Sequence, residues 1–331
     1  RLQTVTGVQT CALPIFQFTY KNQRYSLTRA LAYHYLMADG TPFQSQEGWQ
    51  TMQYNQEFNG RDPRMAQTIA APDYVAVGAD ASSKYYPSCK DYERSGYRPI
   101  KYFSDDTHDG ATTSTTDYAI FRYGEVLLNY VEAKAELGQA DQSVIDETVN
   151  VIRARVGMPG LDVAKANAAP DSFLSSYYTD KHLEGADKGL ILEIRRERTV
   201  ELVNEGFRLW DMLRWHEGQQ ICPASNTLGP GFIGCWFPGL GEYDMNNDGK
   251  PDLCIYSGST PQTDCDNTLN VALGKENTLS EGTSGYLVQF KDQTYKWEEK
   301  DYLYPIPNKQ MQIYPIDETT GKSVLTQNPG Y

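Results

Sequence analysis

The sequence has no long hydrophobic run. No segment approaches the roughly 18 consecutive apolar residues that a membrane-spanning helix needs, so we expect no such helix. Positive charge is also scarce, because 30 lysine and arginine residues stand against 43 aspartate and glutamate residues, and the net charge of the 331-residue chain is −13. Nucleic acids and anionic membrane surfaces need clustered positive charge in their partners. We therefore expect neither as a binding partner.

Several familiar catalytic motifs are absent as well. The chain contains no GxSxG, GxxxxGK or HExxH sequence, and its four histidines are scattered. Glu197 and Glu201 could serve as the carboxylate pair of a glycoside hydrolase. They share a predicted helix with Arg195, Arg196 and Arg198, however, so we expect them to form ion pairs. The sequence thus predicts that the protein is not an enzyme.

Cysteine is sparse. No CxxC pair occurs and no histidine lies at metal-ligand spacing from a cysteine, so we expect no zinc site. Four cysteines bracket one loop-rich region of the chain. If the protein is exported, Cys222 with Cys235 and Cys254 with Cys265 are plausible disulfides that close local loops. Free, partly buried thiols are the alternative, and the sequence leaves the pairing open.

The N-terminal stretch 1–16, RLQTVTGVQTCALPIF, does not fit the rest of the chain. Its part VTGVQTCALPI looks like the translation of a sequencing-adapter oligonucleotide, and it lacks the basic start, the long apolar core and the cleavage site of a signal peptide. We therefore treat these residues as non-native. The native part is expected to begin at residue 17 and to be incomplete at its N-terminus.

The longest patterned stretch runs from Leu190 to Trp215 and predicts a helix. Its apolar residues recur at three- and four-residue intervals and predict one buried stripe: Leu190, Ile191, Ile194, Leu202, Val203, Leu209, Trp210 and Leu213. A second stripe carries charges that can pair one turn apart: Glu201, Glu205, Arg208, Asp211 and Arg214. Gly206 is expected to kink or break the run. A helix with these two stripes has to pack against other helices, which indicates a structural role.

Three further helices are expected, over residues 26–40, 118–138 and 142–156. The last two together have the length of one tetratricopeptide-like unit. Their facing residues are expected to be Tyr123, Leu127, Tyr130, Val131, Val149 and Ile152. Because a single helix pair cannot bury its own apolar face, it needs neighbouring helices.

The stretch DMNNDGKPD places oxygen-bearing side chains in one short loop: Asp244, Asn246, Asp248 and Asp252. Gly249 permits a sharp turn there, and hard oxygen ligands suit calcium, so the sequence predicts a structural Ca²⁺ site. Ile255 stands where an EF-hand needs a bidentate glutamate, so the affinity is expected to be modest. An Asx-rich turn without a metal is the alternative.

Tyrosine is abundant, with 24 residues against 11 phenylalanines and 5 tryptophans. A tyrosine or tryptophan ring is apolar on its face and polar at its tip, so it can stack on a sugar while hydrogen-bonding the hydroxyls. Four rings on predicted loops are the candidate glycan contacts: Trp236, Tyr243, Trp49 and Tyr86. Alternatively, such rings cover the helices, which would favour a protein-interaction scaffold.

Four sequence blocks resemble one protein family. The block ERTVELVNEGFRLWDMLRW resembles the signature near the C-terminal end of the SusD/RagB family, the surface nutrient-binding lipoproteins of Bacteroidetes. The other blocks follow in family order along the chain: RDPRMAQTI in 61–69, FRYGEVLLNYVEAKAELG with VNVIRARVGMPGL in 121–161, and YLYPIPNKQMQIYP followed by TQNPGY in 302–331. On these blocks the chain is identified as a member of that family.

The resemblance implies a mainly α fold, in which tetratricopeptide-like helix pairs carry long loop-rich insertions and a few short strands. One SusD-like domain, incomplete at its N-terminus, would span residues 17–331. Its helical scaffold would occupy about 118–216 and its loop-rich insertion about 217–300.

The resemblance also implies a non-catalytic protein on the extracellular face of the outer membrane. Such a protein binds oligosaccharides and delivers them to a SusC-like TonB-dependent transporter. Its export signal and the cysteine of its lipid anchor would lie upstream of this chain. The binding loops of the family vary in sequence, so no glycan-contact residue is carried over. A peptide-binding or protein-interaction helical scaffold is the alternative function.

Overall fold

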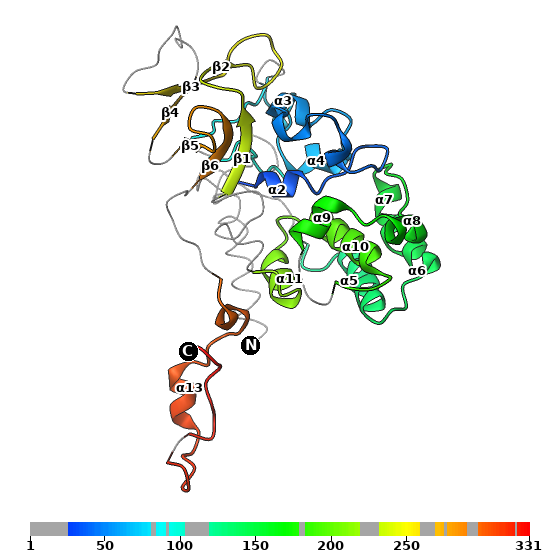
Figure 1. Ribbon diagram of the computed structural model, residues 1–331, viewed down its shortest axis with the longest axis vertical. Helices are drawn as coiled ribbons and strands as arrows, with labels where there is room; N and C mark the ends of the chain where they lie inside the picture. The colour runs from blue at the N-terminus through cyan, green and yellow to red at the C-terminus, as the bar shows by residue number, and fades with distance from the viewer. Residues whose placement is uncertain are drawn as a thin grey trace.

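The structure is a computed structural model (Figure 1), and it describes residues 26–80, 84–90, 93–102, 119–178, 183–218, 232–258, 269–274, 277–289, 297–321 and 323–331. Helices gather on one side of the body and the strands on the other, while the C-terminal segment extends away from both (Figure 1). None of the helices among these residues has both the length and the apolar character that crossing a membrane requires.

Short helices form the first part of the described chain. They are α2 (Arg29–Ala32), the 3₁₀ turns η1 (Phe43–Ser45) and η2 (Trp49–Thr51), α3 (Tyr54–Glu57) and α4 (Pro63–Thr68). The prediction of one helix over 26–40 is wrong, because α2 ends at Ala32. The Arg61 guanidinium binds the carbonyl oxygens of Ala32 and Tyr35 at 2.6 and 2.9 Å, and these are acceptors that a continuing helix would use.

The helical scaffold consists of seven elements within the described residues. They are α5 (Tyr123–Glu136), α6 (Gln142–Glu147), α7 (Val149–Arg155), α8 (Val163–Ala168), α9 (Ser172–Tyr177), α10 (Lys188–Glu201) and α11 (Arg208–Arg214). Helix α10 lies at the centre, in contact with α5, α8 and α9. The predicted break at Gly206 is confirmed, since Asn204 and Gly206 adopt left-handed backbone angles with φ of 62° and 85° between α10 and α11.

The break changes which side chains are buried. Leu190, Ile194 and Leu202 belong to one buried cluster, as the apolar stripe predicts. Leu209 and Trp210 are 49% and 55% exposed, so the stripe does not continue into α11. The periodicity fails there because α11 starts a new helix axis after the left-handed turn, and Asp211 is the buried residue of that helix.

The predicted helix pair is present in part. Leu127 and Val131 of α5 pack in one cluster with Val149 and Ile152 of α7, as predicted. Tyr123 and Tyr130 do not face this cluster: both are exposed. The second helix of the pair is divided at Thr148, whose φ and ψ of −127° and −89° are not helical and whose hydroxyl donates to the Val144 carbonyl at 2.5 Å.

The loop-rich region carries two small sheets. Their strands are β1 (Phe232–Phe237), β2 (Gly241–Tyr243), β3 (Leu253–Ser257), β4 (Leu269–Leu273), β5 (Thr278–Leu279) and β6 (Gly285–Gln289). One sheet has the order β1-β6-β5 with antiparallel pairs, and the other has the order β2-β3-β4, in which β3 and β4 run parallel. Buried residues of both sheets share a hydrophobic cluster with α2, α3 and α4. The few short strands expected in this region are therefore present.

The C-terminal segment forms an arm. It contains η3 (Glu299–Tyr302) and α13 (Asn308–Ile313), and Figure 1 shows it projecting below the body. Its base contacts the scaffold, since the Tyr302 ring stacks on His216 at 3.7 Å and the Tyr304 ring lies 6.0 Å from Trp210. Farther along, apolar residues such as Ile313 and Ile316 are exposed.

Candidate functional site

Glu197 and Glu201, which could serve as the carboxylate pair of a glycoside hydrolase, lie in an ion-pair network on α10. Glu197 binds Arg64 at 2.5 Å and Arg153 at 2.9 Å. Glu201 binds three arginines at 2.6 to 3.1 Å: Arg64, Arg122 and Arg155. Arg64 of the block RDPR thus pairs with carboxylates of the helical part, whereas Arg61 of the same block binds backbone carbonyls.

The electrostatics of this network keep its carboxylates ionised. Burial alone would raise the pKa of Glu197, but Arg64 and Arg153 lower it from 4.5 to about 2. The same opposition between burial and arginine charges lowers the pKa of Glu201. A glycosidase acid has to be protonated before it can donate a proton. These two residues instead hold α10 against the segments that carry the arginines.

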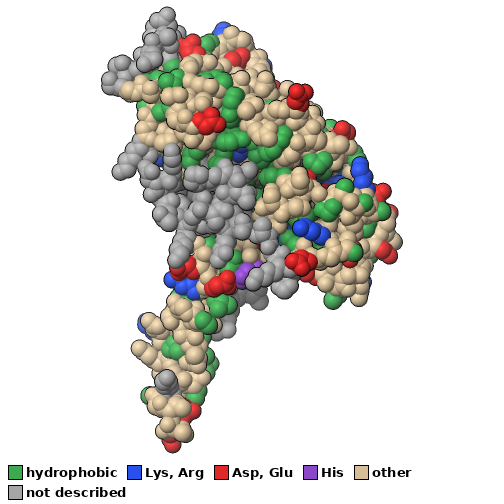
Figure 2. Space-filling model, in the orientation of Figure 1, with side chains coloured by type: hydrophobic (Ala, Val, Ile, Leu, Met, Phe, Trp, Pro, Cys, Tyr) green, Lys and Arg blue, Asp and Glu red, His purple; other side chains and the backbone are tan. Residues whose placement is uncertain are grey.

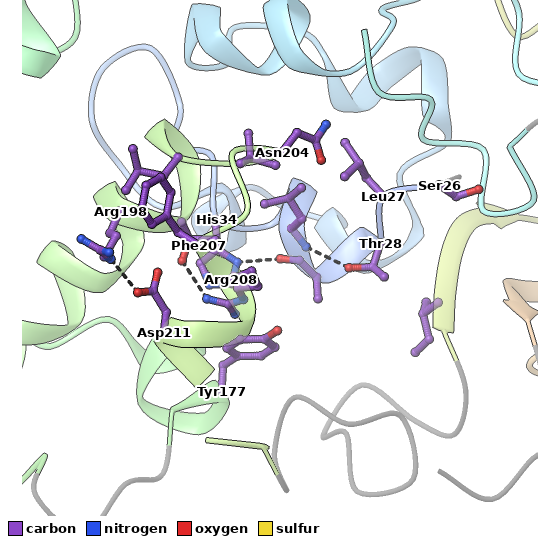
Figure 3. Close-up of a pocket in the computed structure, with 16 residues that line it drawn as sticks. Ser26, Leu27, Thr28, His34, Tyr177, Arg198, Asn204, Phe207, Arg208 and Asp211 are labelled. Carbon is purple, nitrogen blue, oxygen red and sulfur yellow. Dashed lines mark hydrogen bonds and ion pairs between the residues drawn. The ribbon is translucent and has the colours of Figure 1, made fainter. Parts of the chain in front are cut away.

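A cavity of about 340 Å³ lies between residues 26–34 and the end of α10 (Figure 3). Ser26 and Thr28 line it from one side, and Arg198, Arg208 and Asp211 line it from the other. Its wall also contains His34 and Tyr177, together with apolar side chains from both sides. The cavity depends on the turn after α10, because that turn places Arg208 opposite the α2 segment.

His34 is a neutral group in this cavity. Its Nδ1 donates to the Ala30 carbonyl, 2.7 Å away, which leaves Nε2 to accept from the Tyr178 hydroxyl at 3.1 Å. Burial lowers the pKa of His34 well below its usual value, and the positive charge of Arg208 lowers it further.

Arg208 differs from the arginines of α10. Its Nη1 donates to the Thr199 hydroxyl at 3.1 Å and lies 3.3 Å from the Tyr178 hydroxyl. No carboxylate in the described part of the chain forms an ion pair with it, although the sequence predicted pairing along the charged stripe. Burial alone would lower the pKa of Arg208, but the adjacent Tyr178 and Tyr177 side chains raise it, so the guanidinium stays charged.

Sequence reasoning missed this cavity. The steps of three and four around Arg208 suggested partners one turn away, and only Asp211 with Arg214, at 2.8 Å, forms such a pair. Glu205 pairs with Lys101 and Arg122 instead. The left-handed turn changes the direction of the Arg208 side chain, and no local sequence motif predicts that direction.

The four candidate glycan contacts lie on different elements. Trp49 packs edge-on against Tyr33, with ring centroids 5.0 Å apart, and Tyr243 packs on Phe237 and donates its hydroxyl to the Gly239 carbonyl at 2.6 Å. Trp236 is half-buried on β1 and Tyr86 is exposed. The structure therefore does not test whether these four rings contact a glycan, and that role stays a prediction.

The predicted calcium loop is organised by its own hydrogen bonds. Asp252 accepts the backbone N–H groups of Met245 and Asn246 at 2.9 and 3.2 Å, Asp244 accepts that of Gly249 at 2.8 Å, and Asp248 accepts that of Lys250 at 2.9 Å. Among the described residues, no three or more histidine, cysteine, aspartate or glutamate side chains are grouped so that they could hold a metal ion. Calcium binding therefore stays a prediction from the sequence.

One predicted disulfide is wrong. Cys235 is a free, buried thiol, so it does not pair with Cys222. It lies in β1 beside the free thiol of Cys89, and burial together with the contact between the two thiols raises the pKa of Cys89. Cys254 is disulfide-bonded. Cys222 and Cys265 lie outside the described residues, so the pairing of Cys254 with Cys265 stays a prediction.

The surface offers no large patch of one charge on the face that Figure 2 shows. Acidic and basic side chains are scattered along its edges, among described residues that are mostly apolar or uncharged (Figure 2). The candidate site is the cavity beside Arg208, because its wall combines apolar side chains with an arginine that has no acidic partner among the described residues.

Solved structures resemble this fold. A SusD-like carbohydrate-binding protein of Bacteroides fragilis aligns with a TM-score of 0.54 at 22% identity, over 88% of this chain and 50% of that one. A second SusD-like protein of Bacteroides fragilis aligns with a TM-score of 0.52 at 21% identity, over 92% of this chain and 47% of that one. The chain thus spans about half the length of these proteins, and at such identities the likeness concerns the fold alone.

The sequence comparisons are more specific. SusD-like protein P38 of Formosa agariphila is 30% identical over 113 residues, which are 34% of this chain and 20% of that protein. The model of the SusD family (SusD_RagB) matches residues 17–331. Because that match covers nearly the whole chain, the protein belongs to the SusD family.

Proposed function

We propose that the protein binds oligosaccharides at the cell surface without chemically changing them. Membership of the SusD family along residues 17–331 carries this proposal. It is supported by the name of the Bacteroides fragilis relative, a SusD-like carbohydrate-binding protein with the same fold. The ion pairs of Glu197 and Glu201 agree with a non-catalytic role, since they give these carboxylates a structural use.

The proposed binding protein acts together with a transporter. In this proposal a lipid anchor holds it on the extracellular face of the outer membrane, where it passes captured sugar to a SusC-like TonB-dependent transporter. The helical scaffold would dock on the transporter, while half-buried or exposed rings such as Trp236 and Tyr86 would contact the glycan.

A glycan array probed with the full chain tests the proposal. We expect binding to at least one oligosaccharide class, and we expect Trp236→Ala to weaken it by about fivefold, because stacking on an aromatic ring contributes on the order of 1 kcal/mol. The control is Trp210→Ala, which removes an exposed indole that is not a candidate contact. A folded protein that binds no sugar would overturn the proposal.

The alternative is a peptide-binding or protein-interaction scaffold. One observation favours it: α5 and its C-cap residue carry an exposed apolar stripe of Tyr123, Val126, Tyr130 and Leu137. A peptide array with the same chain separates the two functions, because only the scaffold predicts peptide binding in the absence of sugar binding.

We also propose a structural Ca²⁺ ion in the loop of Asp244, Asn246, Asp248 and Asp252. Burial, together with the negative charges of Asp248 and Asp244, raises the pKa of Asp252, so a cation there would relieve repulsion. We expect calcium to raise the melting temperature and a chelator to reverse this. Asp248→Asn should remove the response, while Asp317→Asn, which changes a partly exposed aspartate elsewhere, should keep it. Identical melting with calcium and with chelator would exclude the site.

A further inference from the structure

Arg208 is a cation that lacks an acidic partner in the described part of the chain. The neighbouring arginines all have one: Arg195 binds Glu217 at 3.3 Å, Arg196 binds Asp171 at 2.5 Å and Arg198 binds Asp211 at 2.8 Å. Arg208 instead reaches neutral groups, the hydroxyls of Tyr178, Thr199 and Tyr177. Arg208 is partly buried, and holding a partly desolvated cation without an opposite charge costs free energy. An anion that enters the cavity would recover it.

The charges around the cavity define the anion. Arg198 and Arg208 line it together with Asp211, and Arg198 and Arg214 already bind Asp211 at 2.8 Å. His34 adds no charge, because its Nδ1 donates to a backbone carbonyl and its Nε2 accepts from a hydroxyl. One positive charge, on Arg208, is left without a counter-ion. A monoanion neutralises it, whereas a doubly charged phosphate would place an excess negative charge beside Asp211.

The remaining wall of the cavity suits a sugar ring. It combines the apolar side chains of Leu27, Leu31 and Phe207 with polar groups at several points, among them Thr28 and Tyr177. A fatty-acid chain would leave these polar groups facing hydrocarbon. A pyranose has apolar C–H faces and hydroxyls around its rim, and about 340 Å³, at the small end of ligand pockets, accommodates a single ring rather than a long chain.

We propose that this cavity binds the carboxylate-bearing ring of a uronic acid unit, with the Arg208 guanidinium paired to the carboxylate. This inference rests on the proposed glycan-binding function and narrows its ligand to acidic oligosaccharides. Arg208 is the specificity-determining residue, because a planar guanidinium can give a carboxylate two parallel hydrogen bonds. A neutral sugar of the same shape would leave that cation unpaired.

Galacturonate and galactose form the matched probe pair, since they differ at one carbon that carries either a carboxylate or an alcohol. Titration of the full chain, followed by saturation-transfer NMR, gives both dissociation constants. We expect galacturonate to bind about tenfold more tightly, as one charge-assisted hydrogen-bonded pair predicts. Arg208→Gln should abolish this preference, and Arg208→Lys should retain part of it. The control Lys165→Gln removes an exposed positive charge on α8 and should change nothing.

Three results would overturn the inference. The first is equal affinity for the two sugars in the wild-type chain. The second is a preference for galacturonate that survives in a folded Arg208→Gln variant. If that variant does not fold, an Arg208→Lys variant with the full wild-type preference would overturn the inference instead. The third is competition by acetate as effective as that by galacturonate, which would show that the ring contributes nothing. If neutral glycans bind on the array but galacturonate has no preference, only this inference fails; if no sugar binds, the proposed function fails with it.

Discussion

Glu197 shows how single residues hold this fold together. Its carboxylate is 2% exposed and pairs with Arg64 from α4 and Arg153 from α7, so one side chain on α10 joins three helices. A buried ion pair of this kind contributes little more to folding stability than well-packed apolar side chains of similar size would. Breaking it is costly, because Arg64 and Arg153 would remain buried with only their other acidic partners to balance their charge.

Glu197→Gln should therefore destabilise the chain by about 3 kcal/mol, the low end for breaking a buried pair, because Arg64 and Arg153 lose that charge but keep Glu201 and Glu193. Urea unfolding followed by tryptophan fluorescence measures the change. The control is Glu299→Gln, which removes a carboxylate that is 76% exposed and lies 3.4 Å from His216. The control should change stability by less than about 0.5 kcal/mol. Equal effects of the two substitutions would contradict the structural role of Glu197.

The same carboxylate predicts a loss of stability in acid. The pKa of Glu197 is about 2 in the folded chain against 4.5 as its ordinary value, so the folded state binds this proton less readily. Its contribution, on the order of 3 kcal/mol, is complete above about pH 5 and is lost as the pH falls toward 2. The lowered pKa values of Glu132 and Glu201 act in the same direction. Urea midpoints measured through this range should fall less in Glu197→Gln than in the wild type; parallel curves would contradict the assignment.

The sequence could predict that these charged side chains form ion pairs, but not which residue pairs with which. A helix crowded with Glu197, Glu201 and several arginines predicts ion pairing, but it does not predict that Arg64, from a distant part of the chain, is a partner. Arg208 carries the same charge in the same stretch, yet it has no acidic partner among the described residues. Which arginine stays unpaired is decided by the turn at residues 202–207 and by the distant α2 segment. Neither is visible in local spacing.

At the scale of elements, the approach of α8 to α10 depends on Gly189. A Cβ at Gly189 would lie 1.9 Å from the carbonyl oxygen of Ala166 in α8. The Asn167 side chain at the end of α8 also accepts the Leu190 N–H at 2.7 Å, so the two helices are fixed to each other at this point. Any side chain there has to push them apart.

Gly189→Ala should accordingly destabilise the chain by about 1–3 kcal/mol, although alanine is the better helix former by about 1 kcal/mol. The matched control is Gly239→Ala, because a Cβ at Gly239 would meet no atom within 4 Å. Differential scanning calorimetry gives the comparison. A Gly189→Ala variant that melts at or above the wild-type temperature would mean that α8 can move away from α10 without a loss of stability.

Elements whose periodicity is long and uninterrupted were predicted well, and elements bounded by tertiary contacts were not. Helices α5 and α10 appear where their repeats place them. The helix expected over 26–40 ends at Ala32 because a guanidinium 29 residues away takes its carbonyl. The exposed Leu209 and Trp210 have the same kind of cause, since the turn at Gly206 ends the period that would bury them.

At the scale of the whole molecule, the scaffold has one apolar surface that the described residues do not cover. Along α5 and its C-cap residue, four apolar residues recur at helical intervals and are 70%, 54%, 46% and 68% exposed: Tyr123, Val126, Tyr130 and Leu137. The opposite face of α5 is buried against α7 and α10. A helix that is apolar on both faces gains free energy from covering its second face, about 25 cal/mol for each Å² removed from water.

Two copies of the chain should therefore associate through this stripe as the protein concentration rises. Sedimentation velocity over the micromolar range should show a growing dimer fraction, and the double variant Val126→Ser/Tyr130→Ser should reduce it because both apolar contacts are lost. The matched control is Val151→Ser, which changes a single exposed valine on α7 that is 45% exposed. If the wild type stays monomeric throughout and the double variant sediments identically, burial of this stripe contributes nothing to association, and the case for a protein partner on α5 loses its support.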